Sequence, residues 1–343
     1  MSLTLKVATN EDMDLWDDIV NRSPHGTIFH HWKFLKIMEK HSSISFLGRS
    51  YPGKLLAFIG FDLEKPVCIC PIFFYDLPFM KTAYSPPLRT EVTYQGPVYA
   101  DYDNLKCSKK EEYAVEFQKS MDSYLEKLHV KITRIKTPPN NTDARAYTWN
   151  GYDVSPCYNY ELDLKAGINS LWENCGKDLR KNVKKTSEKG VTVREGGRED
   201  LKYIFEAFIS RYKMQAVPTE VAYEYVLDLY DCFYPDHLRF FMSEKDGKFL
   251  SGQLMLMHKG KTLTWIGTAK NSIEGVSPND LLLWEIIRWS VENGYSTLEL
   301  TWANTRRLCK YKSKFNPRAV PYFSCEKCSP LISAFLKLKQ KHN

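Results

Sequence analysis

Short stretches of alternating apolar and polar residues in the second half of the chain are separated by longer stretches with helical spacing. Helical spacing predicts helices over 201–212, 222–234 and 278–293. The alternation predicts strands over 191–195, 238–243, 249–258, 262–268 and 297–302. Asp246-Gly247 and Lys259-Gly260-Lys261 have the composition of tight turns, so the three middle strands should form two antiparallel hairpins.

The first half of the chain has elements of the same kinds in a similar order. Helices are expected over 12–20, 34–41 and 111–128, and strands over 45–49, 55–62, 67–74 and 132–136. The similarity of the halves predicts an internal duplication, with its boundary in the turn-rich stretch 150–156. We therefore expect an N-terminal domain over 1–155, a C-terminal domain over 156–330 and a basic tail over 331–343. Such an order is typical of an α/β (α+β) fold with mixed, mostly antiparallel sheets flanked by helices.

The positive charge of the chain is concentrated in two segments. The formal net charge is +7. Residues 177–198 contribute +5 and residues 302–318 contribute +6, so the rest of the chain carries −4. This pattern indicates one or two anion sites rather than a protein that coats nucleic acid.

Several classes of protein lack their usual sequence signals here. The longest apolar runs, 55–61 and 72–74, are well short of the ~20 residues of a membrane helix, and residues 1–6 do not read as a secretory signal. A cytoplasmic protein with reduced cysteines is therefore expected. Cys325-Glu326-Lys327-Cys328 has no second ligand pair, so no metal site is predicted. The Walker A, dinucleotide-binding, serine-hydrolase and zinc-protease motifs are also absent from the sequence.

Three basic or helix-starting segments are candidates for chemistry. Residues 171–190 read as one helix with an apolar stripe and a basic face, which is either solvated or a phosphate contact. Residues 278–293 follow an N-cap, Ser277, and Asp280 should complete a capping box; an anionic ligand at this helix start is the alternative to simple capping. Residues 306–315 read as an extended segment, and its cationic face is either an anion site or solvent-facing.

The order of elements resembles the GNAT acyltransferase fold, and local strings are similar to those of its FemAB and BioF2-like group. Tyr311-Lys312-Ser313-Lys314-Phe315 looks like the group's aromatic-Lys-x-x-Phe, and residues 179–191 look like its basic helix followed by Gly-Val. Ser23-Pro24-His25-Gly26 and Gln95-Gly96-Pro97-Val98 extend the resemblance into the first half.

The resemblance implies two tandem GNAT-like domains, the first degenerate and the second holding the donor site. It implies transfer of an acyl or aminoacyl group from acyl-CoA, or from aminoacyl-tRNA, to an amine of an amino sugar, peptide or cell-envelope precursor, without a permanently bound cofactor. Lys312 would either stabilise the oxyanion or neutralise a phosphate of the donor. Tyr311 would donate a proton, and the amides of Gly267 and Thr268 would polarise the carbonyl.

Further residues are expected around this centre. Expected donor contacts are Gly267, Thr268, Ser277, Asn279, Lys310 and Lys314. Expected acceptor contacts are Trp32, Lys36, Arg180, Lys184 and Trp302. Glu299 and His258 could act as a base, although a structural role is the alternative for each. The competing class is a non-catalytic module that binds a polyanion, RNA or anionic lipid, which would show a steep dependence on salt.

Overall fold

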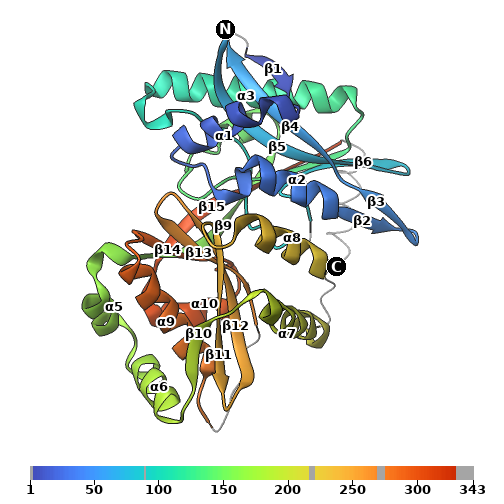
Figure 1. Cartoon of the computed structure of the whole chain (residues 1–343). Helices are drawn as coiled ribbons and strands as arrows, with labels where there is room; N and C mark the ends of the chain where they lie inside the picture. Colours follow the sequence, from blue (N-terminus) through green and yellow to red (C-terminus); the bar gives the residue numbers. More distant parts are fainter. Residues whose placement is uncertain (1–2, 89, 216–220, 269–274, 330–343) are drawn as a thin grey trace, which may run out of the picture. The chain divides into compact units, whose positions relative to one another are not determined.

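The chain forms two compact units in its computed structural model, which describes residues 3–88, 90–215, 221–268 and 275–329 (Figure 1). Unit 1 comprises Met1–Cys157 and Pro321–Asn343, and unit 2 comprises Tyr158–Val320. The domain boundary predicted after residue 155 lies two residues before the point where the chain passes from unit 1 to unit 2, after Cys157. The predicted end of the second domain at 330 does not match, because residues 321–328 return to unit 1. The predicted tail 331–343 lies outside the described residues.

Unit 1 is built on a mostly antiparallel sheet in the order β1-β4-β5-β6-β8-β15, with β7 paired to β5. Its strands are β1 (Thr4–Val7), β4 (Lys54–Asp62), β5 (Lys65–Leu77), β6 (Met80–Ser85), β7 (Val98–Tyr99), β8 (Ile132–Lys136) and β15 (Arg318–Cys328). A small separate hairpin joins β2 (Ser43–Phe46) and β3 (Arg49–Pro52). The helices are α1 (Met13–Arg22), α2 (Trp32–His41), α3 (Cys107–Lys127) and α4 (Arg145–Trp149), with short 3-10 turns η1 (Asn10–Asp12), η2 (Ile28–His30) and η3 (Tyr102–Asn104).

Unit 2 has a sheet in the order β9-β14-β13-β12-β11-β10, in which β13 and β14 are parallel. Its strands are β9 (Asp153–Asp163), β10 (Thr192–Glu195), β11 (Leu238–Lys245), β12 (Lys248–His258), β13 (Lys261–Gly267) and β14 (Thr297–Leu300). The helices are α5 (Ile168–Asn174), α6 (Lys177–Glu188), α7 (Leu201–Met214), α8 (Tyr223–Phe233), α9 (Pro278–Glu292) and α10 (Arg306–Lys312), with 3-10 turns η4 (Leu164–Ala166), η5 (Arg198–Asp200) and η6 (Ser313–Phe315). The predicted mixed fold class is confirmed.

Helix α9 forms the centre of the core of unit 2. Ile286 and Ile287 are buried and pack with Leu298 of β14. Leu179 and Val183 of α6 join the same cluster, which confirms the predicted apolar stripe of that segment. Burial of these side chains supplies the main stabilisation of the unit, at about 1.5–3 kcal/mol for each large side chain.

Two segments differ from the sequence prediction. Residues 171–190 form two helices instead of one, because Cys175 and Gly176 have extended backbone and the Gly176 amide donates to the Lys314 carbonyl at 2.8 Å. Residues 306–315 are helical rather than extended. Thr305 begins α10 as its N-cap, and its hydroxyl accepts from the Leu308 amide at 3.4 Å.

Other strands were placed wrongly or missed. The predicted strand 45–49 is the turn between β2 and β3, at Leu47-Gly48. Strand β6 was missed, and β9 occupies part of the stretch predicted as a linker.

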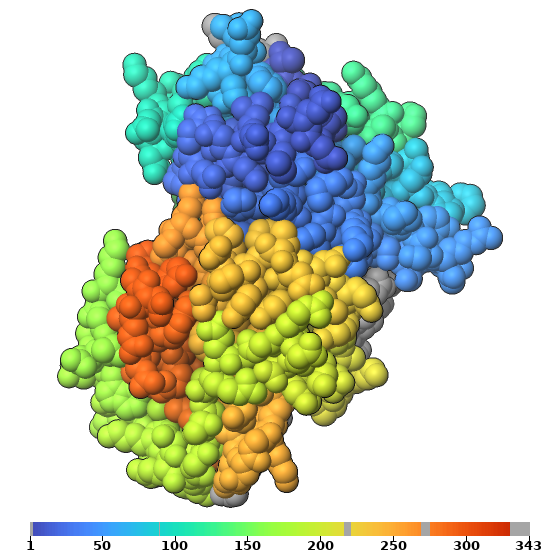
Figure 2. Space-filling view, in the orientation of Figure 1, coloured from blue at the N-terminus to red at the C-terminus, as the bar shows by residue number. Residues whose placement is uncertain are grey.

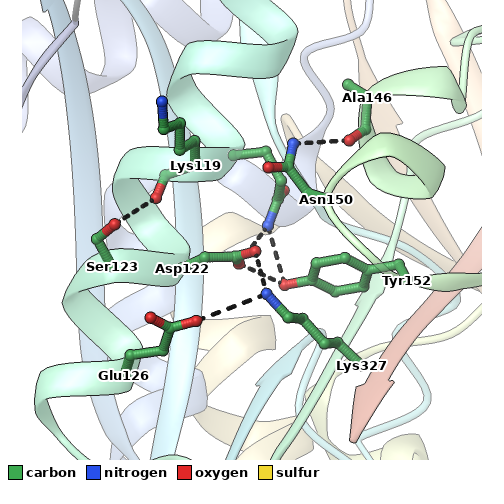
Figure 3. A network of polar contacts seen from close by, with 9 residues as sticks. Lys119, Asp122, Ser123, Glu126, Ala146, Asn150, Tyr152 and Lys327 are labelled. Atoms are coloured by element: carbon green, nitrogen blue, oxygen red, sulfur yellow. Dashed lines mark hydrogen bonds and ion pairs between the residues drawn. The ribbon is translucent and has the colours of Figure 1, made fainter.

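A buried polar network attaches β15 to the rest of unit 1 (Figure 3). The Asp122 carboxylate of α3 accepts hydrogen bonds from Gln118 Nε2 at 2.8 Å and from the Tyr152 hydroxyl at 2.7 Å. Lys327 of β15 donates to the other oxygen of Asp122 at 2.9 Å, and lies 3.7 Å from Glu126. One carboxylate therefore connects α3, the segment before β9 and the strand that returns from unit 2.

Candidate active site

The parallel strands of unit 2 separate at their carboxyl ends. Pairing of β13 with β14 runs from Lys261↔Thr297 to Thr264↔Leu300, whereas β13 continues to Gly267. The Thr301 hydroxyl closes the end of the paired region by donating to the Thr264 carbonyl at 2.7 Å. Residues 265–267 therefore present a strand edge that β14 does not cover.

The two backbone amides predicted to polarise a carbonyl have different surroundings. Thr268 donates its amide to the Gly252 carbonyl at 3.0 Å, so it is already used within the sheet and does not fit the predicted role. Successive amides of a strand point to opposite edges, so the Gly267 amide faces the uncovered edge. A side chain at Gly267 would bring Cβ within 2.5 Å of Gln253 Oε1. A larger residue at this position would therefore displace the Gln253 side chain.

Lys312 lies at the same end of the sheet. Its ammonium donates to the Thr301 carbonyl, just beyond the end of β14. Burial lowers the pKa of Lys312 to about 8, and the positive charge of Arg211 acts in the same direction, while Cys309 and Glu299 oppose it. The site therefore holds an amine whose charge changes near neutral pH, a property common in functional sites. Arg211, at the end of α7, was missed in the sequence.

Trp302 follows β14 with a left-handed backbone, φ +66°. For a bulky aromatic residue this conformation is an outlier, and such strain persists only where neighbours enforce it. The Trp302 amide donates to Asn159 Oδ1 at 2.9 Å, and Asn159 Nδ2 donates to Glu299 Oε1 at 2.7 Å. Asn159 is completely buried. This residue of β9 was not identified from the sequence, where the preceding stretch 150–156 reads as a linker and no strand is predicted around position 159.

The start of α9 holds polar atoms without protein partners. Ser277 Oγ, Asn279 Oδ1 and Asp280 Oδ1 are buried and make no hydrogen bond within the described residues. The predicted capping box is not formed, because the other oxygen of Asp280 accepts from Asn182 Nδ2 at 3.1 Å and lies 3.9 Å from Lys314 Nζ. Asp280 is thus bound to α6 and η6.

Tyr311 connects α10 to the start of α9. Its hydroxyl donates to the Asn279 carbonyl at 3.0 Å. Burial, and then the charge of Asp280, raise the pKa of Tyr311. The phenol therefore stays protonated and attaches α10 to the start of α9, and its role as a proton donor stays a prediction.

The remaining predicted contacts fall into three groups. Lys310 and Lys184 are exposed, and Arg180 is half-buried on α6. Trp32 is 4% exposed and packs edge-to-face on Trp16, so its predicted contact with an acceptor does not fit a residue of the core of unit 1. Lys36 of the same unit pairs with Glu39. The described residues contain no cluster of three potential metal ligands.

The corresponding place in unit 1 is filled by the chain itself. Strands β6 and β8 are also parallel, and their pairing ends at Ser85↔Ile135. Just beyond, the Gln95 amide donates to the Lys136 carbonyl at 3.0 Å and the Gly96 amide donates to Ser85 Oγ at 3.0 Å. Gly96 has φ +64°, and a Cβ there would lie 2.9 Å from the Lys136 carbonyl oxygen. An inserted segment therefore covers, in unit 1, the place between the two parallel strands that the described residues of unit 2 leave uncovered.

The chain is similar to one protein-family model and to several solved structures. Residues 173–313 match the family model described as an acetyltransferase (GNAT) domain. The crystal structure of FemX superimposes with a TM-score of 0.67 over 93% of this chain and 96% of that chain, at 13% identity. L-PGS from Bacillus licheniformis gives 0.53 over 89% and 95% at 12% identity, and a tandem GNAT protein from the clavulanic acid biosynthesis pathway gives 0.52 over 94% and 98% at 10% identity.

Residues 173–313 are therefore similar to a GNAT domain. The whole chain has the fold of the Fem-type GNAT group, as the sequence resemblance predicted. No curated protein sequence matches this chain. None of the helices within the described ranges has the length and apolar character needed to cross a membrane.

Proposed function

We propose that the protein is an N-acyltransferase that moves an acyl group from acyl-CoA to a primary amine. The observation that supports this most directly is the position of Lys312, whose ammonium lies where β13 and β14 separate, on the side of the uncovered edge that ends at Gly267. The amine nitrogen attacks the thioester carbonyl, the new C–N bond forms, the C–S bond breaks, and the thiolate leaves with the proton released by the amine. Lys312 and the Gly267 amide stabilise the oxyanion of the tetrahedral intermediate.

The acceptor that we propose is an amine of an amino sugar, a peptide or a cell-envelope precursor. Trp302, Lys184 and Arg180 remain our proposed acceptor contacts, and Gly267, Ser277, Asn279, Lys310 and Lys314 our proposed donor contacts. We place the reaction in the cytoplasm, where acyl-CoA is supplied. Calorimetric titration with a panel of acyl-CoAs tests the donor. Saturable binding of one member supports acyl-CoA as the donor, and the absence of binding by every member rejects it.

Aminoacyl-tRNA is the second candidate donor, and exposed cations support it. Two helices carry exposed basic side chains for which the described residues supply no ion pair: Lys177, Lys181, Lys184, Lys185, Arg306, Arg307 and Lys310. The same amine would then attack an ester carbonyl, and the tRNA ribose hydroxyl would leave. Binding of charged tRNA that weakens steeply with salt supports this donor, since the slope reports the number of phosphates neutralised. Polyanion binding without any acyl transfer would instead indicate a binding module.

The titration of Lys312 predicts the pH dependence of turnover. Only the ammonium form stabilises an oxyanion, and this form is lost as the pH rises through about 8. We therefore expect kcat with saturating substrates to fall above pH 8. The variant Lys312→Arg keeps its charge and should retain an activity that is flat up to pH 9.5. A kcat that instead rises through pH 8 would show that the neutral amine acts, as a base.

A further inference from the structure

Three hairpin tips of unit 1 each carry an exposed apolar side chain on a left-handed backbone. Leu47 is 78% exposed with φ +50°, Leu63 is 83% exposed with φ +57°, and Phe79 is 99% exposed with φ +67°. The left-handed region is unfavourable for these residues. Because their side chains are exposed, they bury no apolar surface that would stabilise the fold. No contact among the residues that the structure describes explains why these three positions are not Gly or Asn.

Two of the tips project from one end of the sheet. Strand β3 leads directly into β4, and Lys54 at the start of β4 pairs with Phe74 of β5. Because β5 continues past Phe74 toward Phe79, the chain before β4 and the chain after Phe74 run out in the same direction. The β2–β3 and β5–β6 hairpins extend together at the right of unit 1 (Figure 1), and form two neighbouring protrusions in blue and light blue (Figure 2). Leu63 lies at the opposite end of β4 and β5.

The charges around the tips differ between the two ends. The charges around Leu63 are balanced, because Asp62 and Glu64 are accompanied by exposed Lys65 and by Lys109, which lies 3.1 Å from Asp62. The paired tips have an excess of cations: Arg49 and Lys54 are exposed beside the Leu47 hairpin. Next to Phe79, Lys81 lies 3.6 Å from Asp76, and the backbone amide of exposed Lys131 donates to the Lys81 carbonyl at 2.8 Å.

We propose that Leu47 and Phe79 insert into the surface of an anionic phospholipid bilayer, and that the neighbouring cations bind its phosphates. Two small apolar tips backed by cations suit the boundary between headgroups and acyl chains, where apolar burial and attraction to anionic lipid add. A protein partner of standard size would require about 800 Å² of continuous, complementary surface on this side, which two separate tips do not offer. The proposal is independent of the acyl-transfer chemistry.

The test is co-sedimentation of the full chain with vesicles of phosphatidylglycerol and phosphatidylcholine, compared with vesicles of phosphatidylcholine alone. The variants are Leu47→Asn and Phe79→Asn, with Leu63→Asn as the matched control, since all three remove an exposed apolar side chain at a left-handed position. Asn tolerates φ > 0, so the melting temperatures should not fall. We expect binding to the anionic vesicles to weaken about 10-fold or more for each paired-tip variant, and to remain unchanged for Leu63→Asn.

Three outcomes would overturn the proposal. The first is failure of the unmodified chain to bind either vesicle. The second is an equal loss of binding in Leu63→Asn and Phe79→Asn, which would make the effect one of general hydrophobicity. The third is self-association in sedimentation velocity that depends on Leu47 and Phe79 without vesicle binding, which would assign the tips to contact between copies of the chain.

Discussion

Replacement of Lys312 by Ala is expected to lower kcat about 100-fold, the order observed when one donor to an oxyanion is removed. The ammonium lies at the carboxyl ends of β13 and β14, where the donor carbonyl would sit, and the shortened side chain cannot reach it. The Thr301 carbonyl also loses a donor, which should cost about 1 kcal/mol of unfolding free energy. Single-turnover measurement of acyl transfer, together with denaturant unfolding, separates the two effects.

Lys185→Ala is the control for this variant. Lys185 is exposed on α6, and its removal should leave kcat within twofold and the unfolding free energy within about 0.5 kcal/mol. A comparable small effect of both substitutions on kcat would show that Lys312 has no part in the chemical step. A large loss of stability with an unchanged kcat would assign it a purely structural role.

The elements that follow from local sequence were predicted well. Strands β11 to β13 are joined by two turns that the sequence predicts, at Asp246-Gly247 and at Lys259-Gly260. Both turns contain residues with left-handed backbone in the structure. Helix α9 was predicted from Ser277-Pro278 to within one residue of its end. Such elements depend on near neighbours, which the sequence displays directly.

Elements that depend on distant partners were not predictable. The break between α5 and α6 is fixed by a hydrogen bond from Gly176 to Lys314, which is 138 positions away in the chain. Strand β15 owes its place to β8, to which it pairs across about 190 residues. The helical form of residues 306–312 also overrides an alternation of charges that suggested a strand.

The residues of the candidate site likewise include some that the sequence predicts and some that it does not. Lys312 and Gly267 were predicted as site residues because they lie in short strings that resemble those of the FemAB and BioF2-like group. Asn159 could not be named, because its importance lies in joining Trp302 and Glu299, two residues of another strand end. The occupied amide of Thr268 likewise depends on the register with Gly252.

Replacement of Asp122 by Ala is expected to lower the unfolding free energy by about 3 kcal/mol or more, the range observed when one partner of a buried ion pair is removed. Asp122 accepts from Gln118, Tyr152 and Lys327, and its side chain is 8% exposed. Without it, the Tyr152 hydroxyl loses its acceptor and Gln118 Nε2 keeps the Tyr152 hydroxyl at 2.9 Å. The ammonium of Lys327 keeps the ring of Tyr152, 5.6 Å from its centroid, and Glu126 at 3.7 Å. Urea unfolding followed by tryptophan fluorescence measures the change.

Glu126→Ala is the matched control, because Glu126 also faces Lys327 from α3 but is 71% exposed. An exposed ion pair of this kind contributes about 0–1 kcal/mol, so this variant should unfold almost as the unmodified chain does. Asp122→Asn should fall between the two variants, since an amide oxygen still accepts one hydrogen bond but provides no charge for Lys327. If Asp122→Ala and Glu126→Ala destabilise the protein equally, the buried network does not hold residues 321–328 in unit 1, and the pairing of β15 with β8 must provide that attachment alone.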